Sequence, residues 1–143
     1  THTTSDRVGA FQRTARELSG VDPVVLECAG LQPSQGAAAL QAFLTGGAQL
    51  DGLFVVTDSL AMGAYQTLKE RGQHIPRDVA VVGVGDNEMA EYFDPPLTTV
   101  AGANDAMVAE AVPLLFGMLE GDRGPPREIL VVPPAFPRSS TRR

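Results

Sequence analysis

The chain has little cysteine, little basic charge and no long apolar run. Its one cysteine, Cys28, excludes an internal disulfide, fits a reducing compartment and is expected to be a buried structural thiol. The 17 acidic residues outnumber 11 lysines and arginines, giving a net charge of −6, so we expect no basic surface for nucleic acid on this chain itself. No window approaches the roughly 20 apolar residues of a membrane span, and no export signal is found at the start. These absences predict a cytoplasmic protein with no membrane contact.

Signatures of metal binding and catalysis are also missing from the sequence. The two histidines, His2 and His74, are widely separated and lack other ligand residues at suitable spacing, so we expect no metal and no cofactor. The run Gly83–Asp86 lacks the other residues of a phosphate-binding glycine loop. No Ser–His–Asp set or carboxylate pair is visible, so we expect a protein that is not an enzyme. An α/β enzyme remains the least favoured alternative.

The most informative segment is residues 51–100, which hold two apolar runs separated by one amphipathic helix. A chain of 143 residues with 43% hydrophobic residues is long enough for one domain with a hydrophobic core. Strand–helix–strand at this spacing predicts a right-handed parallel crossover. The runs LFVV and VAVVGV end near polar residues at Thr57-Asp58 and Gly85-Asp86. Ligands of open parallel sheets bind outside the carboxyl ends of the strands, so we expect a small-molecule site there.

Hydrophobic periodicity predicts further strands and helices on both sides of this segment. Strands are expected over 24–29, 53–56, 79–84, 97–100 and 129–132. Helices are expected over 5–18 (capped by Ser5 or Thr4), 33–45, 59–71 and 104–120 (capped by Asn104 and kinked at Pro113), with one turn at 88–93. This alternation predicts α/β architecture with a parallel sheet. The first helix has no strand before it, so either the chain is part of something longer or another molecule supplies that edge.

Residues 55–100, VVTDSLAMGAYQTLKERGQHIPRDVAVVGVGDNEMAEYFDPPLTTV, carry a family pattern. They resemble the effector-binding domain of lactose-repressor-type (LacI/GalR) bacterial transcription regulators. That family has (N/G)D–x–MAxGA after a strand, then G–x–x–xP–x–D–x–xVVG–(Y/F)DD, then Y–xxPxLTT(V/I). The final PREILVVPPAFPRSST is similar to the family's closing strands and Arg–x–Ser–Thr ending.

This resemblance implies the fold and the domain organisation. The implied fold is periplasmic-binding-protein-like (type I), with this chain forming a three-layer α/β/α lobe around a parallel sheet. Residues 1–143 would be the C-terminal portion of a two-lobed domain, mostly its second lobe. The 104–120 helix would belong with a first lobe that the chain mostly lacks. We therefore predict that the apolar face of this helix leads to swapping or self-association.

The resemblance also implies an effector site, with one contact near the start of the chain and one after the second expected strand. The family's cleft arginine falls on Arg7, whose guanidinium can form two hydrogen bonds to vicinal hydroxyls or to a carboxylate. The family's stacking aromatic falls on Leu31, which cannot stack on a sugar ring in the same way.

The other expected effector contacts follow the two central strands. The asparagine of the family's Asn–Asp pair falls on Thr57, which keeps a hydroxyl and loses the amide, and Asp58 follows it. The first aspartate of the family's Asp–Asp pair falls on Gly85, and Asp86 takes the second position. Both aspartates have an alternative structural role, and Asp58 in particular is placed to cap a helix. Because three of the four family contacts differ here, the resemblance does not carry over the identity of the effector.

A second expected surface is apolar. Met62 lies off the apolar stripe of its helix, and with three residues of the following turn it could form an exposed patch, which usually marks association. The family uses the matching helix and turn for its dimer interface, so we expect a homodimer contact at Met62, Met89, Tyr92 and Phe93. The alternative is that these residues simply pack under the loop 94–98.

Together these features predict a ligand-sensing and dimerisation module of a LacI-family transcriptional regulator. It would close around a small, polar, sugar-like metabolite and so modulate DNA binding by a helix-turn-helix outside this chain. The alternative is a periplasmic solute-binding protein of a sugar transporter, which shares the two-lobed fold. The two differ in what lies upstream, since the regulator predicts a helix-turn-helix and the transporter component predicts a signal peptide.

Overall fold

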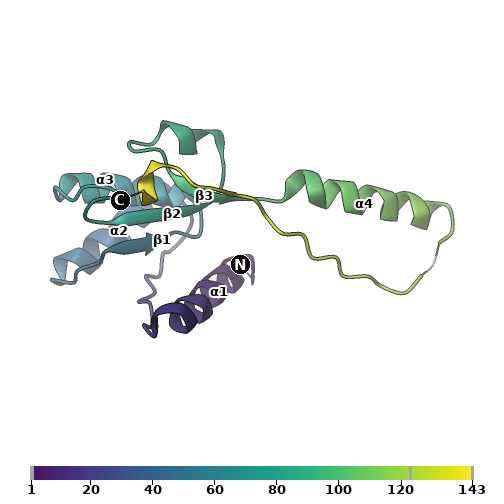
Figure 1. Ribbon diagram of the computed structural model, residues 1–143, viewed down its shortest axis with the longest axis horizontal. Coiled ribbons are helices and arrows are strands. Elements are labelled where there is room, and N and C mark those ends of the chain that lie inside the picture. The colour runs from purple at the N-terminus through teal and green to yellow at the C-terminus, as the bar shows by residue number, and fades with distance from the viewer. Residues whose placement is uncertain (1, 123, 143) are drawn as a thin grey trace.

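The computed structural model describes residues 2–122 and 124–142, and its centre is a four-stranded sheet with helices on both faces (Figure 1). The strands are β1 (Gly52–Phe54), β2 (Ala80–Gly85), β3 (Thr98–Ala101) and β4 (Ala135–Phe136). The helices are α1 (His2–Ser19), α2 (Pro33–Thr45), α3 (Asp58–Glu70) and α4 (Asn104–Leu119), with short 3₁₀ helices η1 (Glu88–Tyr92) and η2 (Ser139–Thr141). The strand order is β1-β2-β3-β4, with the first three strands parallel and β4 antiparallel to β3. The predicted parallel α/β fold class is confirmed.

The central crossover β1–α3–β2 is the one that the two apolar runs predicted. The register pairs Leu53 with Val81, and α3 returns the chain so that β2 lies parallel to β1. One face of the sheet packs against α2 and α3, and this interface is the hydrophobic core. Its buried members are Leu40, Leu44, Val55, Leu60, Ala61, Ala64, Tyr65, Leu68, Val79, Val81, Ala90 and Leu97.

Two glycines allow α2 and α3 to approach closely. A side-chain carbon at Gly63 would overlap the carbonyl of Pro33, and one at Gly36 would overlap the carbonyl of Leu60. The Thr67 hydroxyl also donates to the carbonyl of Ala37, at 3.3 Å, so the two helix backbones are in polar as well as steric contact. Any larger residue at these glycines would push the helices apart and open the core.

Helix α1 covers the opposite face of the sheet at β1. Because side chains alternate along a strand, Phe54 points away from the core that Leu53 and Val55 join. Its ring stacks on Phe11 of α1, with ring centroids 4.6 Å apart and planes 7° from parallel. The sheet therefore has helices on both faces, as the expected three-layer arrangement requires.

Two expected strands are absent from the described sheet. Residues 24–29 have no strand assignment, so β1 is the edge, and Val24 of this segment is 70% exposed. Residues 129–132 are also irregular, with Leu130 87% exposed, and the tail pairs instead through β4. Both predictions were wrong because a β-branched apolar run shows strand propensity but does not identify a hydrogen-bonding partner.

Three expected helix caps were also wrong. Ser5 lies inside α1, which begins at His2, and Asn104 is the first residue of α4 rather than its cap. The capping role expected of Asp58 belongs to Thr57, since α3 begins at Asp58, one residue before the expected start, and the Thr57 side chain caps it. These differences shift helix ends by a few residues and leave the helices themselves in place.

Helix α4 projects away from the sheet, and residues 124–134 return beside it to β4 (Figure 1). None of its 16 described residues is buried, although Leu115, Phe116 and Met118 are apolar. Its expected association with a first lobe, and the expected self-association, stay predictions. In the parts of the chain that the structure describes, no helix, α4 included, has the length and apolar character needed to cross a membrane.

The contrast between the core and α4 predicts two different responses to leucine truncation. Leu68→Ala removes a side chain that is fully buried, so it should lower the free energy of unfolding by about 2–5 kcal/mol. Leu115→Ala, at a position 56% exposed, should change it by no more than about 0.5 kcal/mol. Urea unfolding followed by circular dichroism measures both. A large loss in Leu115→Ala would show that α4 is packed against something.

Candidate functional site

The carboxyl ends of β1 and β2 lie side by side and form the first candidate site. The Arg7 guanidinium, from α1, donates through one nitrogen to the carbonyl of Val56 at 2.9 Å. This places the positive charge of Arg7 where the chain leaves β1. The next residue, Thr57, begins α3. The structure therefore brings Arg7 and Thr57 to the same edge of the sheet, as the sequence predicted for a ligand-binding edge.

Thr57 and Asp58 carry out structural roles at the start of α3. The Thr57 hydroxyl oxygen accepts from the backbone N–H of Leu60 at 3.3 Å, which is a helix cap. Asp58 is only 1% exposed. Its carboxylate accepts from the Thr99 hydroxyl at 2.8 Å and from the backbone N–H of Asn87 at 3.1 Å. In this conformation the Asp58 carboxylate has internal partners and does not reach the surface.

Room for that carboxylate is provided by Gly83 in β2. A side-chain carbon at Gly83 would overlap Asp58 Oδ1, and it would also crowd a methyl group of Leu97. The family-like VVG pattern therefore has a local reason, since the strand must pass within contact distance of a buried charge.

The turn after β2 has an unusual backbone. Gly85 has φ +141°, and Asp86 has φ +49°, which is left-handed and uncommon outside glycine, asparagine and aspartate. The Asp86 N–H donates to the Thr99 hydroxyl oxygen at 3.2 Å, so Thr99 links this turn to Asp58. The Asp86 carboxylate accepts from the Arg138 guanidinium at 2.8 Å.

Arg138, like Thr99 and Asn87, belongs to this hydrogen-bonded region and was not expected there from the sequence. Only 16% of its side chain is exposed, and it contacts both Asp86 and Glu91. Burial lowers the pKa of its guanidinium, but the carboxylates of Asp86 and Glu91 outweigh burial, so the net shift is upward. The sequence signal for Arg138 was the Arg–x–Ser–Thr ending. Its acidic partner Asp86 lies 52 residues away in the chain, and no local sequence pattern indicates such a pairing.

The six expected effector positions therefore fall into three groups. Arg7, Thr57 and the Gly85-Asp86 turn lie along the carboxyl edge. Asp58 lies directly behind them, inside the protein. Leu31 is on the loop before α2, 44% exposed, and is not part of the hydrogen-bonded set.

Within the described residues, no cluster of three or more His, Cys, Asp or Glu side chains is placed to hold a metal ion. Burial raises the pKa of the Cys28 thiol.

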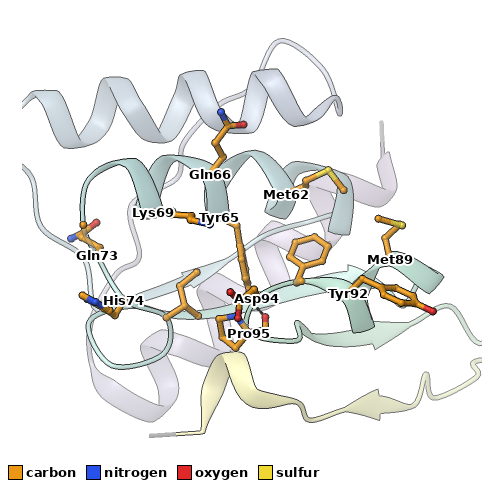
Figure 2. Close-up of a pocket in the computed structure, with 13 residues that line it drawn as sticks. Met62, Tyr65, Gln66, Lys69, Gln73, His74, Met89, Tyr92, Asp94 and Pro95 are labelled. Atoms are coloured by element: carbon orange, nitrogen blue, oxygen red, sulfur yellow. Dashed lines mark hydrogen bonds between the residues drawn. The ribbon is translucent and has the colours of Figure 1, made fainter.

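The second candidate site is a groove of about 570 Å³ between α3 and the loop that carries η1 (Figure 2). All four residues expected at a dimer interface line it, with Met62 39%, Met89 51% and Tyr92 72% exposed. Figure 2 shows Met62, Met89 and Tyr92 near one end and Gln73 and His74 near the other.

Phe93 and Tyr65 form the floor of this groove. Their rings meet edge to face, with centroids 4.7 Å apart, a favourable aromatic geometry. The Tyr65 hydroxyl donates to the carbonyl of Pro95 at 3.1 Å. Burial raises the pKa of Tyr65 to about 12. A phenol is neutral at physiological pH even at its ordinary pKa of about 10, so the hydroxyl has its proton available for this bond.

The internal role of Asp58 makes a direct prediction. Asp58→Asn replaces one acceptor oxygen with a donor, so it cannot accept from both Thr99 and Asn87 as the carboxylate does. The free energy of unfolding should fall by about 1–3 kcal/mol, measured by urea denaturation. The matched control is Asp6→Asn, at an exposed position on α1, which should change stability by no more than about 0.5 kcal/mol. Equal effects in the two variants would rule out the structural role of Asp58.

Comparisons with known proteins agree with this architecture. Residues 1–141 match the family described as the periplasmic binding protein-like domain. Among curated relatives, the chain is 31% identical over 140 residues to the HTH-type transcriptional regulator MalR of Streptomyces coelicolor, an alignment covering 94% of this chain and 40% of that protein. The chain therefore spans about two fifths of the length of this relative.

Solved structures give the same result. A LacI-type transcription regulator from Bifidobacterium animalis superposes with a TM-score of 0.85 at 28% identity, covering 96% of this chain and 50% of that one. A LacI family regulator from Enterococcus faecium, solved with bound ribose, has a TM-score of 0.80 at 25% identity, covering 96% and 51%. The chain thus belongs to the periplasmic binding protein-like domain family, in the form found in LacI-type transcriptional regulators.

Proposed function

We propose that this chain is the ligand-sensing and dimerisation part of a LacI-type transcriptional regulator and has no enzymatic activity. It would bind a small, polar, sugar-like metabolite at the carboxyl edge of its sheet. DNA would be contacted only by a helix-turn-helix outside this chain. Ligand binding can change DNA affinity only if the ligand binds two arrangements of the protein with different affinity.

The observation that carries the proposal is the placement of Arg7. Its guanidinium is held against the carbonyl of Val56, beside Thr57 and on the same edge as the Gly85-Asp86 turn. A planar fork of donors anchored in this way suits vicinal hydroxyls or a carboxylate. The bound ribose of the Enterococcus faecium regulator supports a sugar-like ligand class here.

A solute-binding protein of a transporter is the alternative, and the relatives favour the regulator. The curated relatives carry names of transcriptional regulators or repressors, among them the HTH-type transcriptional regulator MalR and the ribose operon repressor of Haemophilus influenzae. Sequencing the coding region upstream of Thr1 separates the two. An encoded helix-turn-helix would support the regulator. An encoded signal peptide would instead support the solute-binding protein of a transporter.

Removing the anchored guanidinium should weaken ligand binding. Isothermal titration calorimetry of the complete gene product against ribose and other sugars, nucleosides and polyols should find at least one ligand. Because hydrogen bonds from charged groups contribute about 1.5–3 kcal/mol, Arg7→Ala should raise its dissociation constant roughly 10- to 100-fold. Arg13→Ala, on the exposed side of α1, should leave the constant unchanged. No heat across the whole panel would contradict the sensor.

We propose a homodimer through the groove of Met62, Met89, Tyr92 and Phe93, since an exposed apolar patch rimmed by polar side chains marks association. Met89→Glu would bury a charge in that contact, so sedimentation velocity should show the dimer dissociation constant raised at least about tenfold. The control Leu18→Glu changes an exposed apolar residue of α1 that does not line the groove, and it should leave the dimer intact. Met107→Glu changes an exposed methionine of α4 and tests the separate association predicted for that helix. Dissociation by Met107→Glu alone would place the contact on α4 instead.

A further inference from the structure

Arg138 contacts the Asp86 turn and also η1, the short helix that carries Met89 and Tyr92 of the groove. One nitrogen of its guanidinium donates to Asp86, in the turn at the ligand edge, at 2.8 Å, and to Glu91, on η1, at 3.3 Å. The side chains are unequally exposed, at 16% for Arg138, 22% for Asp86 and 69% for Glu91. The contact with Asp86 is therefore the shorter and the better shielded from water, and the contact with Glu91 is the weaker.

A second connection from Arg138 to η1 runs through the backbone. Its other terminal nitrogen donates to the carbonyl of Leu97 at 3.0 Å. The N–H of Leu97 donates in turn to the carbonyl of Ala90 at 2.8 Å. Ala90 lies between Met89 and Glu91 in η1, and both Ala90 and Leu97 are fully buried. The guanidinium is thus connected to η1 through one exposed ion pair, with Glu91, and through the backbone of one buried residue, Leu97.

The tail that carries Arg138 is itself fixed to the sheet. The Arg138 N–H donates to the Thr98 hydroxyl oxygen at 2.8 Å. The Ser140 hydroxyl donates to the carbonyl of Val81 at 2.6 Å and accepts from the Thr98 N–H at 2.8 Å. The Phe136 ring lies 5.6 Å from the guanidinium carbon, within cation–π range. Arg138 is therefore held by the sheet, and the two carboxylates share it.

We propose that Arg138 is a positioning residue that couples the Asp86 turn at the ligand edge to η1 and the groove. A ligand hydroxyl that bonds to Asp86 competes with Arg138 for the carboxylate. The guanidinium then shifts toward Glu91, and η1 moves with it, carrying Met89 and Tyr92. By linkage, an occupied groove changes ligand affinity at Asp86 in return. The role of this coupling in ligand sensing rests on the proposed function. The structural link from Asp86 through Arg138 to η1 does not depend on it.

Methionine methyl resonances can test this link without any ligand. The chain has four methionines: Met62 and Met89 line the groove, and Met107 and Met118 lie on α4. With ¹³C-methyl methionine labelling, Asp86→Asn should displace the Met89 resonance, and that of Met62 to a smaller extent. The two α4 resonances should stay in place. In an Arg138→Gln background, the same Asp86→Asn change should no longer displace Met89.

The matched control is Arg142→Gln, which removes a neighbouring tail arginine whose guanidinium donates to the carbonyl of Pro137. In that background the Met89 response to Asp86→Asn should persist. An equal response with and without Arg138 would overturn the proposal, because the signal would then travel through the backbone between Asp86 and Met89.

A conservative variant keeps the test decisive if circular dichroism shows that Arg138→Gln does not fold. Arg138→Lys retains the charge, but its single nitrogen cannot reproduce the forked contacts to Asp86 and Leu97. The Met89 response should then fall to a fraction of the wild-type response, and an undiminished response would overturn the coupling. Since no ligand is used, this result is independent of the Arg7 titration, and either proposal can fail alone.

Discussion

The hydrogen-bonded, buried carboxylate of Asp58 is the interaction on which the proposed ligand edge depends. It begins α3, where the helix dipole favours a negative charge, and it binds the Thr99 hydroxyl of β3 and the N–H of Asn87 after β2. Burying a charge is costly unless it is hydrogen-bonded, and here one partner comes from β3 and the other from the turn after β2. Gly83 leaves the space that the carboxylate occupies. One side chain thus fixes how the ends of β2 and β3 sit against α3.

That arrangement changes what a ligand can meet at this edge. Both aspartates are already hydrogen-bonded within the protein, Asp58 to Thr99 and Asn87, and Asp86 to Arg138. On the proposed ligand edge, the groups presented are then a guanidinium, a hydroxyl, the left-handed backbone of a tight turn, and an Asp86 carboxylate that a ligand meets only in competition with Arg138. Such a surface differs from one with a free Asp–Asp pair, which offers strong acceptors for sugar hydroxyls. At the proposed edge, Thr57 and Gly85 stand where the resembled family pattern has an asparagine and an aspartate, so we expect different ligand chemistry there.

The sequence predicted the central crossover because its signals are local. A run of apolar residues, an acidic residue at a helix start and an amphipathic helix each act within a few residues, and they predicted β1, α3 and β2, although the cap of α3 is Thr57 and not Asp58. The run 24–29 and the run 129–132 failed because strand formation needs a partner that propensity does not identify. Arg138 was missed for the same reason, since its contact with Asp86 is set by the tertiary fold. The groove residues were recognised through Met62, whose position off the apolar stripe of α3 was visible in the helical periodicity.

Helix α4 leaves the sheet after β3, and the chain returns to β4 at the same place. The N–H of Ala101 donates to the carbonyl of Pro134 at 2.9 Å, so the outgoing and returning segments are joined there. Because the segments that connect α4 to the sheet lie next to each other, α4 is attached at one place. Torsional changes in a few backbone bonds there would reorient the whole helix. A change in the orientation of α4 would therefore act first on the end of β3 at Ala101. This end lies two residues beyond Thr99, and Thr99 binds both Asp58 and the backbone of Asp86.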